Sequence, residues 1–230
     1  MQQGHTMEIW LDTSDKNLIS KAKKMGILHG VTTNPSIIAS SCKSLEEVLN
    51  EVLQIQTGPV TAQVTTLDAS SMIEQAEKLF SFSSRIIVKI PATEQGLEAI
   101  THLSRQKLSV MSTCVFHPNQ VILSCLAGAS YIAPYFSRLH DSGEDAQSVL
   151  KEMLKLIEMY KFPVKLLAAS LRSSDQVRQC MDMGIHAVTL KEKIFAEFTG
   201  DHPLTLENLD RFAKDWENAK PSQLLPEKEF

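Results

Sequence analysis

Hydrophobic and polar positions divide the chain into eight short apolar segments and longer amphipathic segments between them. The segment at 86–90 is rich in β-branched residues and apolar on both faces, as expected of a strand buried on both sides. The apolar segments lie at 9–12, 30–33, 60–64, 86–90, 109–115, 131–135, 164–169 and 186–190. Between them, apolar residues recur at helical spacing. We expect these helices at 16–25, after Ser44, after Asp68, after Thr93, at 118–127, at about 144–160, after Ser173 or Ser174, and at 191–198.

Eight strand–helix units in about 200 residues predict an α/β fold, a single (β/α)8 TIM barrel. The alternative is a doubly wound open sheet, which needs a glycine-rich phosphate loop after the first strand. This chain has Asp12-Thr13-Ser14-Asp15 at that point, so the barrel is favoured. We expect one domain over residues 7–220, with loose termini at 1–6 and 221–230.

A ninth helix is predicted at about 206–216, outside the eightfold pattern. Leu206, Leu209, Phe212, Ala213 and Trp216 form one apolar face of it. An apolar face needs a partner surface. This extra C-terminal helix is therefore expected either to cover its own barrel or to dock on a neighbouring subunit.

Composition removes several classes of function. The formal net charge is −4, so no basic surface for nucleic acid is expected. No apolar run approaches the roughly 20 residues of a membrane span. The four cysteines lack metal-ligand spacing, so we expect no metal site and reduced thiols in a cytoplasmic protein.

The strand at 86–90 carries Lys89 between Val88 and Ile90. Burial disfavours the charged ammonium and therefore lowers the pKa of a lysine. A lysine with a lowered pKa is a nucleophile for carbonyl carbons. The structural alternative is a Lys89 side chain that pairs with a neighbouring acid or reaches the surface.

The carboxyl ends of the predicted strands carry polar side chains. Barrel enzymes place their chemistry at these ends. Each residue taken singly could cap a helix, make a turn or satisfy backbone groups, but their convergence around a buried lysine favours an active site. The residues are Asp12, Thr32, Asn34, Gln63, Lys89, Thr113, Tyr135 and Ser170.

A phosphate site is predicted after the seventh strand. Ser170, Arg172 and a new helix N-terminus lie within five residues, and such a group suits an anion. Arg138, just after the sixth strand, can reach the same anion. The structural alternative for both arginines is ordinary surface ion pairing.

The chain resembles the small transaldolase and fructose-6-phosphate aldolase family of class I aldolases over residues 8–218. The resemblance rests on Leu11-Asp12-Thr13-Ser14-Asp15, Gly30-Val31-Thr32-Thr33-Asn34-Pro35-Ser36, Val88-Lys89-Ile90-Pro91, Ala133-Pro134-Tyr135 with Arg138, and Ala168-Ala169-Ser170. It implies sugar-phosphate and dihydroxyacetone-type substrates and no cofactor, because the iminium is itself the electron sink.

The resemblance also implies residue roles. Lys89 matches the Schiff-base lysine and Asp12 the acid/base aspartate. Thr32 and Asn34 match residues that hold substrate hydroxyls. Arg138, Ser170 and Arg172 match the phosphate anchor. From the proposed chemistry, Gln63, Thr113 and Tyr135 are expected to hold a water that transfers protons.

Two activities remain open within the family. Family transaldolases usually carry glutamate at the position of Gln63 and phenylalanine at that of Tyr135, so the glutamine–tyrosine pair favours fructose-6-phosphate aldolase. The segment 201–205 is more similar to bacterial transaldolases, which move a dihydroxyacetone unit between sugar phosphates in the pentose phosphate pathway. A non-catalytic sugar-phosphate binder is a third alternative. The resemblance further implies a homo-oligomer, a pentamer or decamer in which the last helix reaches a neighbouring subunit.

Overall fold

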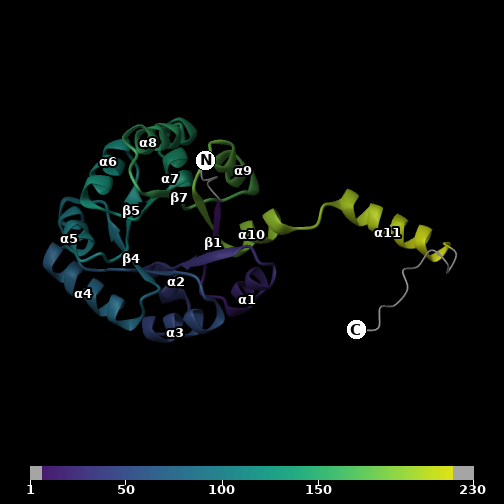
Figure 1. Ribbon diagram of the computed structural model, residues 1–230, viewed down its shortest axis with the longest axis horizontal. Coiled ribbons are helices and arrows are strands. Elements are labelled where there is room, and N and C mark those ends of the chain that lie inside the picture. The colour runs from purple at the N-terminus through teal and green to yellow at the C-terminus, as the bar shows by residue number, and fades with distance from the viewer. Residues whose placement is uncertain (1–6, 220–230) are drawn as a thin grey trace.

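The computed structural model describes residues 7–219, which fold around eight parallel strands. The strands form a closed barrel in chain order, β1 to β8, with the helices outside it (Figure 1). The predicted (β/α)8 barrel is therefore confirmed. The strands are β1 Glu8–Asp12, β2 Leu28–Thr32, β3 Val60–Gln63, β4 Ile86–Pro91, β5 Val110–Val115, β6 Tyr131–Pro134, β7 Lys165–Ala168 and β8 Ala187–Leu190.

The helices follow the expected alternation, with two additions. The short helices α2 and α7 directly follow strand ends and were not predicted, because six residues are too few to show a helical period. The helices are α1 Lys16–Lys24, α2 Pro35–Ser40, α3 Leu45–Ile55, α4 Ala69–Phe82, α5 Glu94–Arg105, α6 Pro118–Ala127, α7 Phe136–Asp141, α8 Ala146–Tyr160, α9 Ser174–Asp182, α10 Glu192–Thr199 and α11 Pro203–Glu217.

The helix starts coincide with the capping residues seen in the sequence. The side chains of Asp15, Asp68, Thr93 and Ser173 accept hydrogen bonds from backbone N–H groups in the first turns of α1, α4, α5 and α9. These bonds satisfy amides that have no partner within a helix. Gly128 ends α6 with a φ of 92°, a conformation that favours glycine.

Two apolar cores hold the barrel. The larger core lies between the strands and the surrounding helices and includes Val88, Ile90 and Leu103. The smaller core fills the barrel interior, and its buried members are Trp10, Ile87, Met111, Tyr131, Ala133, Leu167, Ala169 and Ala187. Since side chains alternate along a strand, Lys89 points inward like Ile87.

Polar groups close the amino-terminal end of the barrel. The buried carboxylate of Glu8 accepts hydrogen bonds from the Trp10 indole, at 3.0 Å, and the Tyr131 hydroxyl, also at 3.0 Å. Lys165 pairs with Glu8, and the His29 ring nitrogen lies 3.5 Å away. Burial alone raises the pKa of Glu8, but the bonds from Lys165 and Trp10 outweigh it and hold that pKa below its ordinary value.

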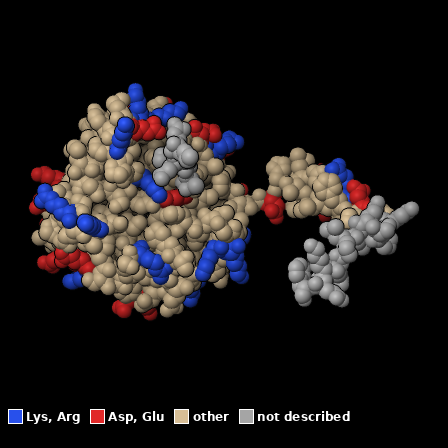
Figure 2. Space-filling view, viewed as in Figure 1, with Lys and Arg blue, Asp and Glu red and all other residues tan. Residues whose placement is uncertain are grey.

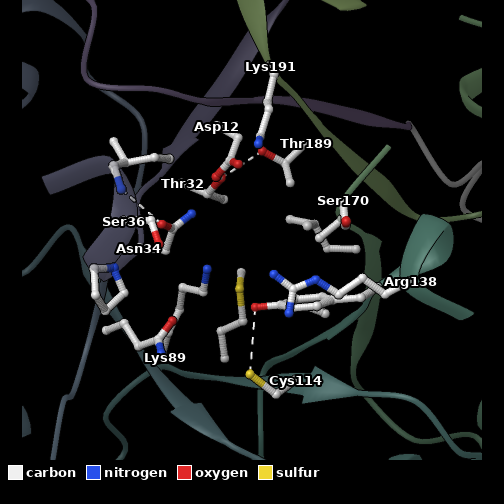
Figure 3. Close-up of a pocket in the computed structure, with 18 of the residues that line it drawn as sticks. Asp12, Thr32, Asn34, Ser36, Lys89, Cys114, Arg138, Ser170, Thr189 and Lys191 are labelled. Carbon is white, nitrogen blue, oxygen red and sulfur yellow. Dashed lines mark hydrogen bonds between the residues drawn. The ribbon is translucent and has the colours of Figure 1, made fainter. Parts of the chain in front are cut away.

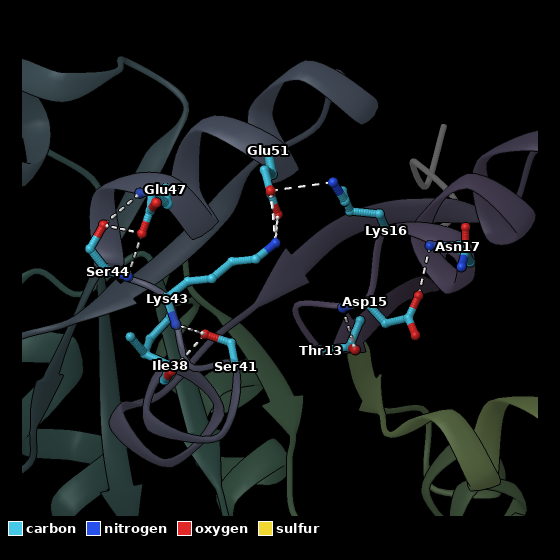
Figure 4. Close-up of polar contacts among 10 residues, drawn as sticks. All are labelled: Thr13, Asp15, Lys16, Asn17, Ile38, Ser41, Lys43, Ser44, Glu47 and Glu51. Atoms are coloured by element: carbon cyan, nitrogen blue, oxygen red, sulfur yellow. Dashed lines mark hydrogen bonds and ion pairs between the residues drawn. The ribbon is translucent and has the colours of Figure 1, made fainter.

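The connection from α2 to α3 is fixed by side chains (Figure 4). Ser44 and Glu47 form a reciprocal capping box at the start of α3. Lys43 contacts Glu51 at 2.7 Å, and Lys16 contacts the same carboxylate at 3.3 Å. These contacts tie α2 to the helical layer, which matters because α2 forms part of the site described below.

Helix α11 leaves the barrel and projects from it (Figure 1). It contains no buried residue, so it does not cover its own barrel. The expected apolar face is exposed, with Leu206 48%, Phe212 57% and Trp216 56% accessible. The expected loose termini fall on residues 1–6 and 220–230, which lie outside the described residues, so that prediction stays untested. Within residues 7–219, no helix is both long and apolar enough to cross a membrane.

Candidate active site

A cavity of about 460 Å³ opens at the carboxyl ends of the strands (Figure 3). We call it the strand-end cavity. Met111, Ala133 and Leu167, which belong to the interior core, supply apolar lining. Its polar and ionisable lining residues are Asp12, Thr32, Asn34, Ser36, Ser40, Gln63, Lys89, Cys114, Tyr135, Arg138, Ser170, Thr189 and Lys191.

Lys89 is buried, with 5% of its surface exposed, and its amine points into the cavity (Figure 3). The amine donates a hydrogen bond to the Thr33 backbone carbonyl at 3.1 Å. Burial lowers the pKa of Lys89, while the charges of Asp12 and Cys114 raise it less. The amine thus has a neutral partner, and its environment favours the uncharged, nucleophilic form.

The Thr33 carbonyl is held in place by β3. The Thr33 amide donates to the Thr61 hydroxyl at 3.1 Å, and the Thr33 hydroxyl donates to the Thr61 carbonyl at 2.7 Å. Both residues are fully buried. The acceptor for the lysine amine is therefore fixed by two hydrogen bonds that do not involve Lys89.

Asp12 is oriented by two threonines. Asp12 and Thr32 are register partners at the ends of β1 and β2, and the Thr32 hydroxyl donates to the Asp12 carboxylate at 2.8 Å. The Thr189 hydroxyl on β8 lies 2.7 Å from that of Thr32. Since Thr32 has one hydroxyl proton and gives it to Asp12, Thr189 donates to Thr32. A chain of hydroxyls across three strands thus positions the carboxylate.

The side-chain amide of Asn34 caps α2 with its oxygen and faces the cavity with its nitrogen. Its side-chain oxygen accepts from the Ile37 amide at 3.0 Å and caps α2. This bond fixes the orientation of the amide, so its nitrogen faces the cavity (Figure 3). Asn34 can therefore donate to a ligand hydroxyl while it holds α2 in place.

Tyr135 presents a phenol to the cavity. Its hydroxyl lies 3.1 Å from the Thr113 hydroxyl and 3.7 Å from the Cys114 sulfur. Burial raises the pKa of Tyr135 to about 12, with the Thr113 bond and the Arg138 charge acting against it. The phenol is protonated near neutral pH and can donate. Thr113 itself is buried behind it and reaches the cavity only through Tyr135.

Arg138 and Ser170 form the opposite part of the lining from Asn34 (Figure 3). The Arg138 guanidinium stacks over the Tyr135 ring, 5.0 Å from its centroid, as a cation–π contact. Ser170 has a φ of 61°, which is uncommon for serine. Its backbone oxygen accepts from the Ser137 amide at 3.3 Å in the first turn of α7.

Arg172 is placed differently from the other predicted site residues. It does not line the strand-end cavity. Its guanidinium pairs with both carboxylate oxygens of Asp141, at 2.6 and 2.9 Å, and its side chain is 59% exposed. Both it and Arg138 were expected to reach one anion, but only Arg138 reaches the cavity.

Several lining residues were missed by the sequence analysis. Thr189 lies next to Leu190, the last residue of β8, so a search that included the penultimate positions of the strands would have found it. Lys191 follows just past the end of β8, and no pattern in the sequence singled it out. Ser36 and Ser40 were not recognisable, because α2 itself was not predicted. Within residues 7–219, no group of three or more His, Cys, Asp or Glu side chains is arranged to hold a metal ion.

Residues 9–225 match the family model of Transaldolase/Fructose-6-phosphate aldolase. The chain belongs to this family. Two curated members of similar length are "Probable transaldolase" proteins of streptococci. The Streptococcus agalactiae protein is 38% identical over 215 residues, covering 93% of this chain and 99% of that protein. The Streptococcus pyogenes protein is 36% identical over 214 residues, covering 93% and 100%.

A solved structure of a more distant protein shares the fold. It is a mandelate oxidase mutant with an FMN adduct, superposed at a TM-score of 0.57 with 13% identity. The match covers 92% of this chain and 73% of the oxidase, and it shows the barrel alone. The chemistry follows from the family match: as a member of the transaldolase/fructose-6-phosphate aldolase family, the protein is an aldolase or a transaldolase that uses a lysine Schiff base.

Proposed function

We propose that the protein is a fructose-6-phosphate aldolase, which cleaves fructose 6-phosphate to dihydroxyacetone and glyceraldehyde 3-phosphate and catalyses the reverse addition. The observation that carries this choice is the Tyr135 phenol in the strand-end cavity, protonated and bound to Thr113. Gln63, which cannot titrate, lines the same cavity. The glutamine–tyrosine pair is the combination that the family resemblance associates with the aldolase.

Cleavage begins at Lys89. Its neutral amine adds to the ketose carbonyl at carbon two, and loss of water gives a protonated imine. Asp12 takes the proton from the hydroxyl on carbon four, the bond between carbons three and four breaks, and its electron pair moves into the imine to form an enamine. Glyceraldehyde 3-phosphate leaves. The buried amine and the oriented carboxylate support these two roles.

Release of the three-carbon unit needs a proton at carbon three of the enamine. We assign its delivery to Tyr135, directly or through a water that Gln63 also contacts, while Thr113 donates to the phenol oxygen. Water then hydrolyses the imine, which frees dihydroxyacetone and restores Lys89. A phenol with a raised pKa keeps its proton until the enamine takes it.

Binding of the substrate is assigned to the remaining lining residues. The Asn34 amide nitrogen and the Thr32 hydroxyl face the sugar hydroxyls, and Arg138 with Ser170 holds the phosphate. The Asn34 orientation imposed by its bond to Ile37 supports the first assignment. The cation–π contact that holds Arg138 over the Tyr135 ring supports the second.

The assay that tests the proposal uses fructose 6-phosphate with and without erythrose 4-phosphate. An aldolase forms glyceraldehyde 3-phosphate without any acceptor. Product that forms only with the acceptor contradicts the aldolase and supports a transaldolase. The names of the streptococcal relatives favour that second candidate.

Tyr135→Phe separates the two activities further. Without the phenol the enamine is protonated slowly, so aldolase turnover should fall about tenfold or more while transfer to erythrose 4-phosphate rises. Thr113→Val is the matched variant, because it removes only the bond to the phenol. Equal turnover of Tyr135→Phe and the wild type would reduce the phenol to a packing role.

Trapping of the imine with borohydride distinguishes the enzyme from a non-catalytic sugar-phosphate binder. Borohydride reduction in the presence of dihydroxyacetone should leave a stable adduct on the peptide that contains Lys89, detected by mass spectrometry. Lys89→Met should give no adduct. A wild-type protein that binds fructose 6-phosphate but forms no adduct would support the binder.

We also propose that the protein forms a homo-oligomer, a pentamer or decamer, in the cytoplasm. The outstretched α11 supports the assembly, because its exposed apolar residues do not pack on their own barrel and can be buried against another copy; the face of α11 seen in Figure 2 is largely uncharged. The free state of all four cysteines supports a reducing compartment. Deletion of residues 203–230 should lower the mass measured by light scattering, and an unchanged mass would contradict the role of α11.

A further inference from the structure

The cations of the strand-end cavity differ from those expected. Besides Lys89, its basic lining residues are Arg138 and Lys191. Arg172, the second cation expected at the phosphate, is engaged by Asp141 outside the cavity. A phosphate monoester carries about −1.5 to −2 charges near neutral pH, so Arg138 alone leaves the charge of such a ligand partly unbalanced.

Lys191 has the right place around the barrel to supply the second charge. Arg138 follows β6, Ser170 follows β7 and Lys191 follows β8, so the serine lies between the two cations. Figure 3 shows the same order around the rim, with the Lys191 side chain entering the cavity beside Thr189. Neighbouring strands lie about 4.8 Å apart. The ends of β6 and β8 are therefore about 10 Å apart, a separation that two long basic side chains can close over one anion.

Local electrostatics leave Lys191 available. Within residues 7–219, no carboxylate lies within 4 Å of its amine. Its neighbour on the helix, Lys193, instead faces Glu197 at 3.9 Å. Lys191 is also the N-cap of α10, and its side chain makes no capping hydrogen bond to that helix. The positive end of the helix therefore adds to the lysine charge.

We propose that Lys191 is a second phosphate-anchoring residue, which closes over the substrate phosphate together with Arg138 and Ser170. This inference rests on the proposed function, since it names the group that holds the phosphate of the same substrate. The long, flexible stem of Lys191 lets the ammonium move from its position beside Thr189 to the anion. Loops after the seventh and eighth strands are a common phosphate site in this fold, and Ser170 and Lys191 come from those two loops.

A different role for Lys191 follows from its nearness to Thr189 in Figure 3. There the ammonium would act on the Asp12 carboxylate through space and would not bind substrate. The two roles differ in what they require of the substrate. A phosphate anchor affects only phosphorylated ligands, whereas a partner of Asp12 affects phosphorylated and unphosphorylated ligands alike.

The test compares Lys191→Gln with Lys193→Gln. Lys193 is a matched control, because it lies two residues further along, in the first turn of α10, is 83% exposed and does not line the cavity. Binding of inorganic phosphate, measured by calorimetry, needs no turnover. We expect Lys191→Gln to weaken it roughly five- to tenfold, the effect of one charge-assisted contact at a partly exposed site. Lys193→Gln should bind like the wild type, and Lys191→Arg should retain most of the affinity.

A second measurement separates the two roles. With Lys191→Gln, the KM for fructose 6-phosphate should rise by the same factor, while borohydride trapping of dihydroxyacetone on Lys89 should proceed at the wild-type rate. Equal phosphate binding by Lys191→Gln and Lys193→Gln would overturn the proposal, as would a lack of phosphate binding by the wild type. Slower trapping of dihydroxyacetone in Lys191→Gln would overturn it in favour of the Asp12 role. Failure of wild-type trapping would count against the proposed aldolase and would leave the phosphate result to be judged on its own.

Discussion

The chain of hydrogen bonds from Thr189 through Thr32 to Asp12 predicts that Thr189, which the sequence analysis did not select as a site residue, affects catalysis. Thr189→Val keeps the shape of the side chain and removes its hydroxyl, which donates to Thr32 at 2.7 Å. Thr189 is 4% exposed, so water does not readily replace the bond. Loss of one partner of a buried hydrogen bond costs about 1–3 kcal/mol. The bond from Thr32 to Asp12 survives, but Thr32 can now rotate.

We therefore expect kcat to fall roughly five- to thirtyfold, corresponding to about 1–2 kcal/mol in the barrier, with little change in KM. Thr32→Val removes the direct bond to Asp12 and should cost more, roughly a hundredfold. The assay is steady-state cleavage of fructose 6-phosphate, coupled to glyceraldehyde 3-phosphate detection. Thr189→Ser, which keeps the hydroxyl, should retain activity close to that of the wild type.

The double variant decides whether the chain acts as one unit. If Thr189 acts only through Thr32, then Thr32→Val with Thr189→Val should be no slower than Thr32→Val alone. Effects that multiply would refute the reasoning, because Thr189 would then have a separate role. Wild-type kcat in Thr189→Val would refute it more simply.

Three further predictions follow from the charges. Burial lowers the pKa of Lys89 and the Asp12 charge raises it, so the rate of imine trapping should increase with pH as the amine deprotonates. Asp12→Asn should move that increase to lower pH. If the pH dependence of trapping is the same in Asp12→Asn and the wild type, the Asp12 charge does not influence the pKa of Lys89. The folded-state pKa of Glu8 lies below its ordinary value, so its stabilisation is present above about pH 4.5 and is lost as the pH falls through the folded-state pKa. Glu8→Gln should lower the free energy of unfolding at pH 7 by about 2 kcal/mol, a value reduced because the partner Lys165 is half-exposed. The difference in stability between Glu8→Gln and the wild type should shrink as the pH falls. A difference between their denaturant midpoints that stays constant with pH would count against this. Arg172→Ala should leave the KM for fructose 6-phosphate within about twofold of the wild type, because Asp141 holds Arg172 outside the cavity, and a large rise would return Arg172 to the phosphate.

The barrel was predictable because its local signals agree with one another. Apolar strands, capping residues such as Asp68 and Thr93, and the glycine at the end of α6 all mark the same boundaries. The helices α2 and α7 were not predictable, since each is only six residues long, and the first amides of α7 donate to the carbonyls of Ala169 and Ser170, which lie far away in the sequence. Asn34 caps α2 through a bond that sequence spacing alone does not distinguish from a turn.

The site was predictable as a set of strand ends, but the partners of its residues were not. The sequence predicted that Arg172, beside Ser170, and Arg138, after the sixth strand, would reach the same anion. Their different surroundings depend on Asp141, at the end of α7, which lies 31 positions before Arg172 in the chain. Conversely, Lys191 carried no special pattern and became notable only when the closed barrel brought β8 beside β7 and β1.

The acceptor of the Lys89 amine belongs to the main chain, at the Thr33 carbonyl. A protonated imine retains one N–H group, and this carbonyl can still accept it after the sugar is attached. No replacement of the Thr33 side chain deletes that oxygen, so a scan of single substitutions among the lining residues would never register its contribution. Its contribution can be tested through Thr61 on the neighbouring strand β3, because the two hydrogen bonds between Thr61 and Thr33 hold this peptide unit in place.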